Sequence, residues 1–150
     1  MTLAPPVMTA AEVTAFLDRE FPQLRDAGEP LFTLVSVGPM AAVMRLAAHP
    51  RHLRPGGTVS GPAMFALADV ALYAAILAQI GPVGLAVTTN LNINFLRKPP
   101  PGALIGTARL LKLGQRLAVG ETAITLPHSD VLVAHATGTY SIPPRVQAAE

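Results

Sequence analysis

The alternation of apolar and polar side chains is clearest between residues 86 and 97. One face of this segment carries Val87, Thr89, Leu91, Ile93 and Phe95, and the other carries Thr88, Asn90, Asn92 and Asn94. A period of two over this length predicts a β-strand. The three asparagines indicate a polar face, either the outer face of a sheet or a contact between subunits.

Residues 62–83 (PAMFALADVALYAAILAQIGPV) form a nearly unbroken apolar segment of a different kind. Ser60 suits a helix N-cap and Gly81-Pro82 suits a helix end, so we expect a helix over about 62–80. Its length approaches that of a membrane-spanning helix, but Asp69 in its first half would be costly in lipid. We therefore expect this helix to be surrounded by protein.

Shorter periodic segments occupy most of the remaining chain. Thr9 and Glu12 match a capping box, which predicts a short helix over 9–21. Turn signals at Gly38-Pro39 and Gly114-Gln115 separate segments that have the pattern of strands. These strands are expected at 31–37, 41–48, 104–113, 116–126 and 131–142, with a frayed tail over 143–150. One apolar helix among antiparallel strands predicts an α+β fold in which the sheet wraps around the helix, with residues 1–150 as a single domain.

The composition suggests that part of the surface is covered by other copies of the chain. Hydrophobic residues make up 51% of the sequence and charged residues only 13%. A monomer with so few charges would expose a large apolar surface to water. We therefore expect a homo-oligomer, either a homodimer or a tetramer built from two dimers.

Several functional classes are disfavoured by the same counts. The net charge is +2, with only two lysines, no tryptophan and no basic run, so we expect no nucleic-acid partner. The absence of cysteine removes disulfides, cysteine zinc sites and a cysteine nucleophile. His49 and His52 lie in a proline-rich loop without acidic neighbours in sequence, so we expect no metal site. The first ten residues lack the pattern of a signal peptide, and we expect a cytoplasmic protein without membrane attachment.

At this point the sequence resembles a known family. Residues 54–62 (RPGGTVSGP), running into 66–69 (ALAD), resemble the signature of hotdog-fold thioesterases of the phenylacetate-degradation (PaaI-like) type, within the 4-hydroxybenzoyl-CoA thioesterase superfamily. Residues 89–102 resemble the family's strand after the helix, and 114–116 and 136–140 fit its last hairpins. The resemblance covers roughly 30–142 and implies the hotdog fold.

The resemblance also implies roles for two residues. Gly61 matches the glycine whose backbone N–H points at the thioester carbonyl, and Asp69 matches the carboxylate that acts as general base or nucleophile. In the family these two groups come from opposite subunits of a dimer. The chain departs from the pattern at three neighbouring positions: Ser60 stands where the family usually has histidine, Pro62 replaces a glycine, and Arg54 stands near a usual Asn or Gln.

The residues themselves suit this chemistry. A helix N-terminus offers free N–H groups to a carbonyl oxygen, and Gly61 has no side chain to keep a ligand away. A carboxylate in apolar surroundings can activate one water or attack directly. Because coenzyme A is a good leaving group, no acid with a strongly raised pKa is required. This fits a site without cysteine, essential histidine or metal, and we expect no cofactor. Each residue also has a purely structural interpretation: Asp69 as a carboxylate paired with Arg54 or a backbone amide, Gly61 as the start of a helix, and Ser60 as its N-cap.

Further residues are candidates for contacts with substrate. The resemblance places the strand after the helix beside that helix, so Thr88 or Thr89 is expected to contact substrate. Arg97, Lys98 and Arg116 are candidates for the phosphates of coenzyme A, although exposed basic side chains are usually only solvated. The complete set of expected substrate-binding residues is Arg54, Ser60, Tyr73, Thr88, Thr89, Arg97, Lys98 and Arg116.

These observations favour an acyl-CoA thioesterase, with the acyl-CoA as its small-molecule partner. The alternative is a non-catalytic acyl-CoA-binding or regulatory domain on the same fold. A hotdog hydratase is disfavoured, because such enzymes use an Asp and His pair near the helix start and no histidine lies between His52 and His128.

Overall fold

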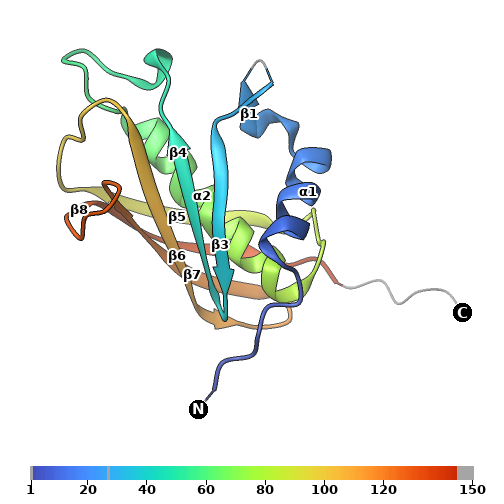
Figure 1. Cartoon of the computed structure of the whole chain (residues 1–150). Helices are drawn as coiled ribbons and strands as arrows, with labels where there is room; N and C mark the ends of the chain where they lie inside the picture. The colour runs from blue at the N-terminus through green and yellow to red at the C-terminus, as the bar shows by residue number, and fades with distance from the viewer. Residues whose placement is uncertain (1, 27, 145–150) are drawn as a thin grey trace, which may run out of the picture.

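The computed structural model describes residues 2–26 and 28–144, in which one long helix lies in the hollow of a curved sheet of six antiparallel strands (Figure 1). The helices are α1 (Ala10–Glu20), α2 (Gly61–Ile80) and the short 3-10 turns η1 (Pro22–Leu24) and η2 (Pro50–His52). The strands are β1 (Arg25–Asp26), β2 (Glu29–Pro30), β3 (Phe32–Gly38), β4 (Ala41–Ala47), β5 (Val87–Phe95), β6 (Ala103–Leu113), β7 (Leu117–Thr125) and β8 (Leu132–Ser141). The predicted architecture is confirmed.

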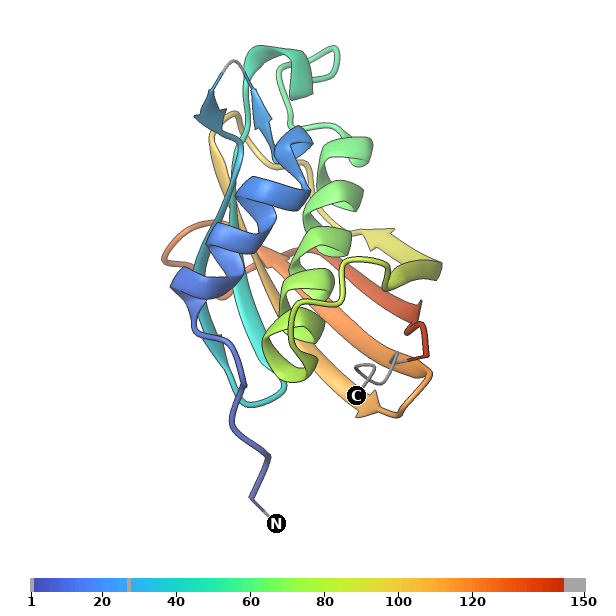
Figure 2. The ribbon, with the colours of Figure 1, turned by 90° about the vertical axis from the view of Figure 1, so that its right-hand side faces the viewer.

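The large sheet has the strand order β3-β4-β6-β7-β8-β5, so β3 and β5 are its edges. Strand β5 follows α2 in the chain but pairs with β8, the last strand. Helix α1 packs alongside α2 and next to β3 (Figure 2). The sequence did not predict η1, η2 or the short β1–β2 ribbon, and residues 145–150 of the expected tail lie outside the described residues.

Helix α2 has the boundaries that its end signals predict. The Ser60 hydroxyl accepts a hydrogen bond from the backbone N–H of Ala63 at 3.4 Å, and Gly81 ends the helix with a φ of 101°. The helix is long and apolar enough to cross a membrane, but 72% of its most apolar window is buried inside the protein. It is therefore the core of this fold, as expected.

Small residues on the inner face of the sheet allow α2 to lie close to it. Gly120 of β7 pairs with Gly138 of β8, and both lie next to the side chain of Leu72 in the helix. A Cβ atom on Gly120 would lie 2.6 Å from Leu72 Cδ2, and one on Gly138 would lie 2.9 Å from Leu72 Cδ1. The hydroxyl of Thr122, which is fully buried, adds a hydrogen bond of 3.0 Å to the carbonyl oxygen of Ala68 in the helix.

A β-bulge in β5 overturns one prediction. Thr88 pairs with Tyr140 and Asn90 pairs with Thr139, so Thr89 is an extra residue in the ladder. The extra residue breaks the strict alternation, and Thr88 therefore faces α2 on the same side as Leu91. Its predicted place on the same face as the asparagines was wrong, because the sequence pattern alone does not reveal a bulge.

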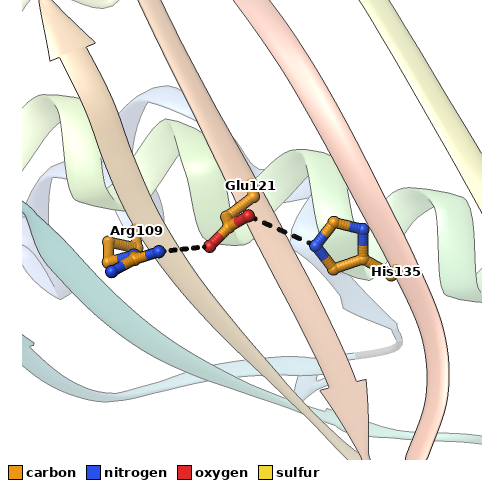
Figure 3. A network of polar contacts seen from close by, with 3 residues as sticks. All are labelled: Arg109, Glu121 and His135. Carbon is orange, nitrogen blue, oxygen red and sulfur yellow. Dashed lines mark hydrogen bonds and ion pairs between the residues drawn. The ribbon is translucent and has the colours of Figure 1, made fainter.

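The outer face of the sheet carries a polar network across three neighbouring strands (Figure 3). Glu121 of β7 accepts a hydrogen bond from Arg109 of β6 at 2.8 Å, and its other oxygen lies 3.3 Å from Nε2 of His135 on β8. The hydrogen bond from Arg109 is the main cause that holds the pKa of Glu121 below its usual value. Because Thr122 points inward to α2, its neighbour Glu121 points away from the helix, and this network lies on the opposite side of the sheet from Asp69.

Candidate active site

The carboxylate of Asp69 is held by two hydroxyl groups. Helix α2 carries Asp69 toward the β5 edge of the sheet, where the side chain is half-buried. Thr88 of β5 and Tyr140 of β8 each donate a hydrogen bond of 2.6 Å to Oδ1 of this carboxylate. The Tyr140 hydroxyl also lies 2.9 Å from the backbone carbonyl oxygen of Asp69. Asp69 is therefore not paired with Arg54, which was its structural interpretation from the sequence.

Asp69 borders a cavity of about 700 Å³ between α1, α2 and the segment that leads into β5. Aromatic rings form much of its wall: the rings of Tyr73 and Tyr140 are stacked with centroids 6.1 Å apart, and Phe21 meets Tyr73 edge-on at 6.2 Å. The lining residues are Phe16, Glu20, Phe21, Asp69, Val70, Tyr73, Pro82, Gly84, Leu85, Ala86, Val87, Thr88 and Tyr140. The cavity thus brings one carboxylate to the edge of a mainly apolar space.

Both tyrosines of the cavity remain protonated over the ordinary pH range. Burial raises the pKa of the Tyr140 phenol, and the neighbouring charge of Asp69 raises it further. Burial also raises the pKa of Tyr73, whose hydroxyl donates to the carbonyl oxygen of Gly84 at 3.0 Å. Because Tyr140 keeps its proton, it remains a hydrogen-bond donor to Asp69.

Gly61 lies in a second, smaller hollow of about 300 Å³ at the start of α2. Pro62 has no N–H and Ser60 caps the N–H of Ala63, which leaves the N–H of Gly61 without an acceptor among the described residues. The hollow is lined by Arg54, Thr58, Val59, Gly61, Met64, Phe95, Arg97, Lys98 and Pro99. The ring of Phe95 lies where a side chain at position 61 would begin, with its Cζ atom 3.2 Å from an added Cβ.

One chain does not bring Gly61 and Asp69 together. They are eight residues apart in one helix, which separates them by about 12 Å along its axis. They also border different hollows, Gly61 beside Phe95 at one end of β5 and Asp69 beside Thr88 at the other.

The other expected site residues do not gather at one place. Tyr73 and Thr88 join Asp69 in the large cavity, whereas Arg54, Arg97 and Lys98 join Gly61. Ser60 is the helix N-cap, and the hydroxyl of Thr89 donates to the carbonyl oxygen of Thr139 at 3.2 Å. Arg116 lies apart, in a third hollow between the β6–β7 turn and Ile142, whose carbonyl oxygen it binds at 3.1 Å. Within residues 2–26 and 28–144, no three His, Asp or Glu side chains are arranged to hold a metal ion.

Comparison of the sequence with models of known protein families identifies the family of this chain. The sequence profile of the thioesterase superfamily matches residues 56–137, more than half of the chain. The chain belongs to this superfamily. The match covers Gly61, all of α2 and most of the strands that wrap around it.

Solved structures agree with this membership. A provisionally assigned thioesterase from Silicibacter sp. TM1040 is 49% identical, with 93% of this chain and 94% of that chain covered and a TM-score of 0.82. A mutant of the phenylacetic acid degradation protein PaaI from Thermus thermophilus is 26% identical, with 75% and 93% covered and a TM-score of 0.65. The E. coli PaaI protein is 21% identical, with 89% and 93% covered and a TM-score of 0.75, a likeness of fold. A search of curated proteins found no match. The chain is thus a hotdog-fold, PaaI-like member of the thioesterase superfamily, and thioester hydrolysis is its class of reaction.

The sequence did not identify Tyr140 or Phe95 as residues of the candidate site. It also did not identify Phe16, Glu20 and Phe21, which line the cavity from α1 and the residue after it. Tyr140 carried one usable signal, because it continues the inward-facing series Ala134, Ala136 and Gly138 on β8. Nothing in the local pattern indicated that its hydroxyl reaches Asp69, since that contact depends on how β5, β8 and α2 fit together.

Proposed function

We propose that this thioesterase-superfamily member is an acyl-CoA thioesterase, which hydrolyses a coenzyme A thioester to a free acid and coenzyme A. The observation that carries the proposal is the Asp69 carboxylate, fixed by two hydroxyls at the edge of an aromatic-lined cavity large enough for an acyl group. The chemistry requires no cofactor, and we place the enzyme in the cytoplasm.

The reaction needs a base or nucleophile on one side of the thioester carbonyl and a hydrogen-bond donor at its oxygen. As a base, Asp69 takes a proton from water while the water oxygen attacks the carbonyl carbon. As a nucleophile, Asp69 forms an anhydride that water then opens. In both routes the C–S bond breaks and the thiolate leaves to be protonated. The N–H of Gly61 stabilises the oxygen that becomes negative, a contribution typically worth about 3 kcal/mol.

A dimer explains how Gly61 and Asp69 meet at one carbonyl. If the edge strands β5 of two copies pair antiparallel, the Thr88 end of one strand lies beside the Phe95 end of the other. Asp69 of one copy then approaches Gly61 of the second, and each dimer has two sites. Exposed apolar side chains along this edge support such pairing, among them Val87 (53% exposed), Phe95 (49%) and Leu96 (51%).

Basic side chains around Gly61 suit the phosphates of coenzyme A. Arg54, Arg97 and Lys98 border the same hollow as the helix N-terminus, which itself favours anions. Arg116 lies in a different hollow of the same chain, so these three residues form the stronger candidate set.

The test is a thiol-release assay over short, medium, long and aryl CoA esters, with Asp69→Asn beside the wild type. Asp69→Asn should keep fold and assembly, because an amide has nearly the shape of a carboxylate, but should abolish hydrolysis. Asp130→Asn makes the same chemical change in the exposed turn between β7 and β8 and should leave the rate unchanged.

Full activity in Asp69→Asn would overturn the assigned role of this residue. Binding of CoA esters by the wild type without thiol release would instead favour a non-catalytic acyl-CoA-binding domain.

A further inference from the structure

The two hydroxyls that contact Asp69 both meet the same oxygen. Thr88 and Tyr140 each donate to Oδ1 at 2.6 Å, and the hydrogen bonds of residues 2–26 and 28–144 give Oδ2 no protein donor. The two oxygens of the carboxylate are therefore not equivalent. One is occupied by the protein, and the other is available to a ligand in the adjoining cavity.

Tyr140 is the more rigidly placed of the two donors. Its side chain is 3% exposed, its ring stacks on Tyr73 with an angle of 12° between the planes, and β8 is paired on both sides, to β5 and to β7. Its hydroxyl also reaches the backbone carbonyl oxygen of Asp69 at 2.9 Å. One phenol thus contacts both the carboxylate and the helix backbone that carries it, which restricts rotation of the Asp69 side chain.

We propose that Tyr140 is a positioning residue that, together with Thr88, holds Oδ1 of Asp69 and so makes Oδ2 the oxygen that reacts. This inference rests on the proposed function, since it assigns a role within the Asp69 chemistry. Tyr140 acts through Asp69 and needs no contact with substrate. The bulge at Thr89 serves this role, because it turns Thr88 to the side of the strand on which Tyr140 lies.

A purely structural role would give Tyr140 a different signature. Thr122 provides the matched comparison, because its buried hydroxyl also joins the sheet to α2, at the carbonyl oxygen of Ala68, without touching the carboxylate. Removing either hydroxyl should lower stability. Only the removal of the Tyr140 hydroxyl should loosen the Asp69 carboxylate.

The experiment compares Tyr140→Phe and Thr122→Val with the wild type in steady-state thiol release and thermal unfolding. Loss of a hydrogen bond to a charged group predicts that kcat of Tyr140→Phe falls about ten- to a hundredfold. KM should stay within about twofold, because ground-state binding of substrate does not use this hydroxyl. Thr122→Val should unfold at a lower temperature with kcat unchanged. Thr88→Val tests the second donor to Oδ1, should also lower kcat, and serves as the variant to measure if Tyr140→Phe does not fold.

The outcomes separate this inference from the proposed function. Thiol release by the wild type with an unchanged kcat in Tyr140→Phe, or in Thr88→Val where only that variant folds, overturns the positioning role and leaves the thioesterase proposal intact. An equal loss of kcat in Thr122→Val and Tyr140→Phe also overturns it, since stability alone would then explain both. No thiol release by the wild type overturns the proposed function and the positioning role together.

Discussion

Gly120 lies on the inner face of the sheet, where Leu72 of α2 leaves no room for a side chain. A Cβ atom at this position would lie 2.6 Å from Leu72 Cδ2 and 2.9 Å from the backbone oxygen of Arg109, which cannot move aside without disturbing the sheet. Gly120→Ala should therefore lower the free energy of unfolding by about 1–3 kcal/mol, the usual cost of overpacking a core. Urea unfolding measures the difference.

Gly38→Ala is the control for this substitution. Gly38 also lies in a strand, but a Cβ there meets nothing within 4 Å. Its alanine variant should be neutral or slightly more stable, because alanine restricts the unfolded chain. Equal stability losses at positions 38 and 120 would contradict the packing explanation.

At the residue scale, the sequence was sufficient to single out some residues of the candidate site and not others. Asp69 was predictable because it is the only charge in a long apolar helix, and Ser60 because N-caps have a local signature. Tyr140 was not, because a buried tyrosine in a strand has the same pattern whatever its hydroxyl contacts. The partner of such a hydroxyl is set by contacts between segments 71 residues apart in the chain.

At the element scale, the Arg109–Glu121–His135 network makes a prediction about the large sheet. The pKa of Glu121 is lowered in the folded chain, chiefly by the hydrogen bond from Arg109. A lowered pKa means that the ionised group stabilises the fold at pH values above the ordinary value of 4.5, and that this stability is lost as the pH falls through the lowered value. Glu121→Gln should thus be less stable than the wild type at pH 7.

Urea unfolding of both proteins at a series of pH values checks this prediction. The difference in free energy of unfolding between them should shrink as the pH falls below 4.5 and disappear in strong acid. A difference that persists or grows at low pH would show that the network does not act through the charge of Glu121.

Elements with strong end signals were predicted almost to the residue, and elements without them were missed. The capping box of α1 and the cap and glycine stop of α2 depend on neighbours a few residues away, so the sequence contains them. The β1–β2 ribbon has two residues in each strand, too few to show a period. The bulges of β3, β5 and β6 were also hidden, because which residue is extra depends on the partner strand.

At the scale of the whole molecule, the proposed dimer, in which Gly61 and Asp69 of different copies share a site, predicts complementation between two inactive variants. Gly61→Val should block one half of each site by filling the hollow beside Phe95, and Asp69→Asn should disable the other half. A mixed dimer has one site with both defects and one site with neither. After exchange of subunits, the mixture should recover about a quarter of wild-type activity, because half of the dimers are mixed and each has one intact site.

The assay is thiol release before and after mixing, with native mass spectrometry to confirm subunit exchange, because the two variant subunits differ in mass. Each variant alone, taken through the same exchange procedure, is the control. If mixed dimers form without any gain in rate, Gly61 and Asp69 of different subunits do not share a site.

The extra residue in β5 has a consequence for how this scaffold can change. The bulge absorbs Thr89 as an extra residue and leaves Thr88 opposite Tyr140, where its hydroxyl meets Asp69. Deleting Thr89 would leave a regular ladder in which Thr88 still pairs with Tyr140 and still faces α2. If instead the bulge were lost at the present length of β5, Thr89 would take the place opposite Tyr140 and would offer the same hydroxyl. Two adjacent threonines therefore make this part of the scaffold tolerant of a one-residue change in length, provided that one of them is retained.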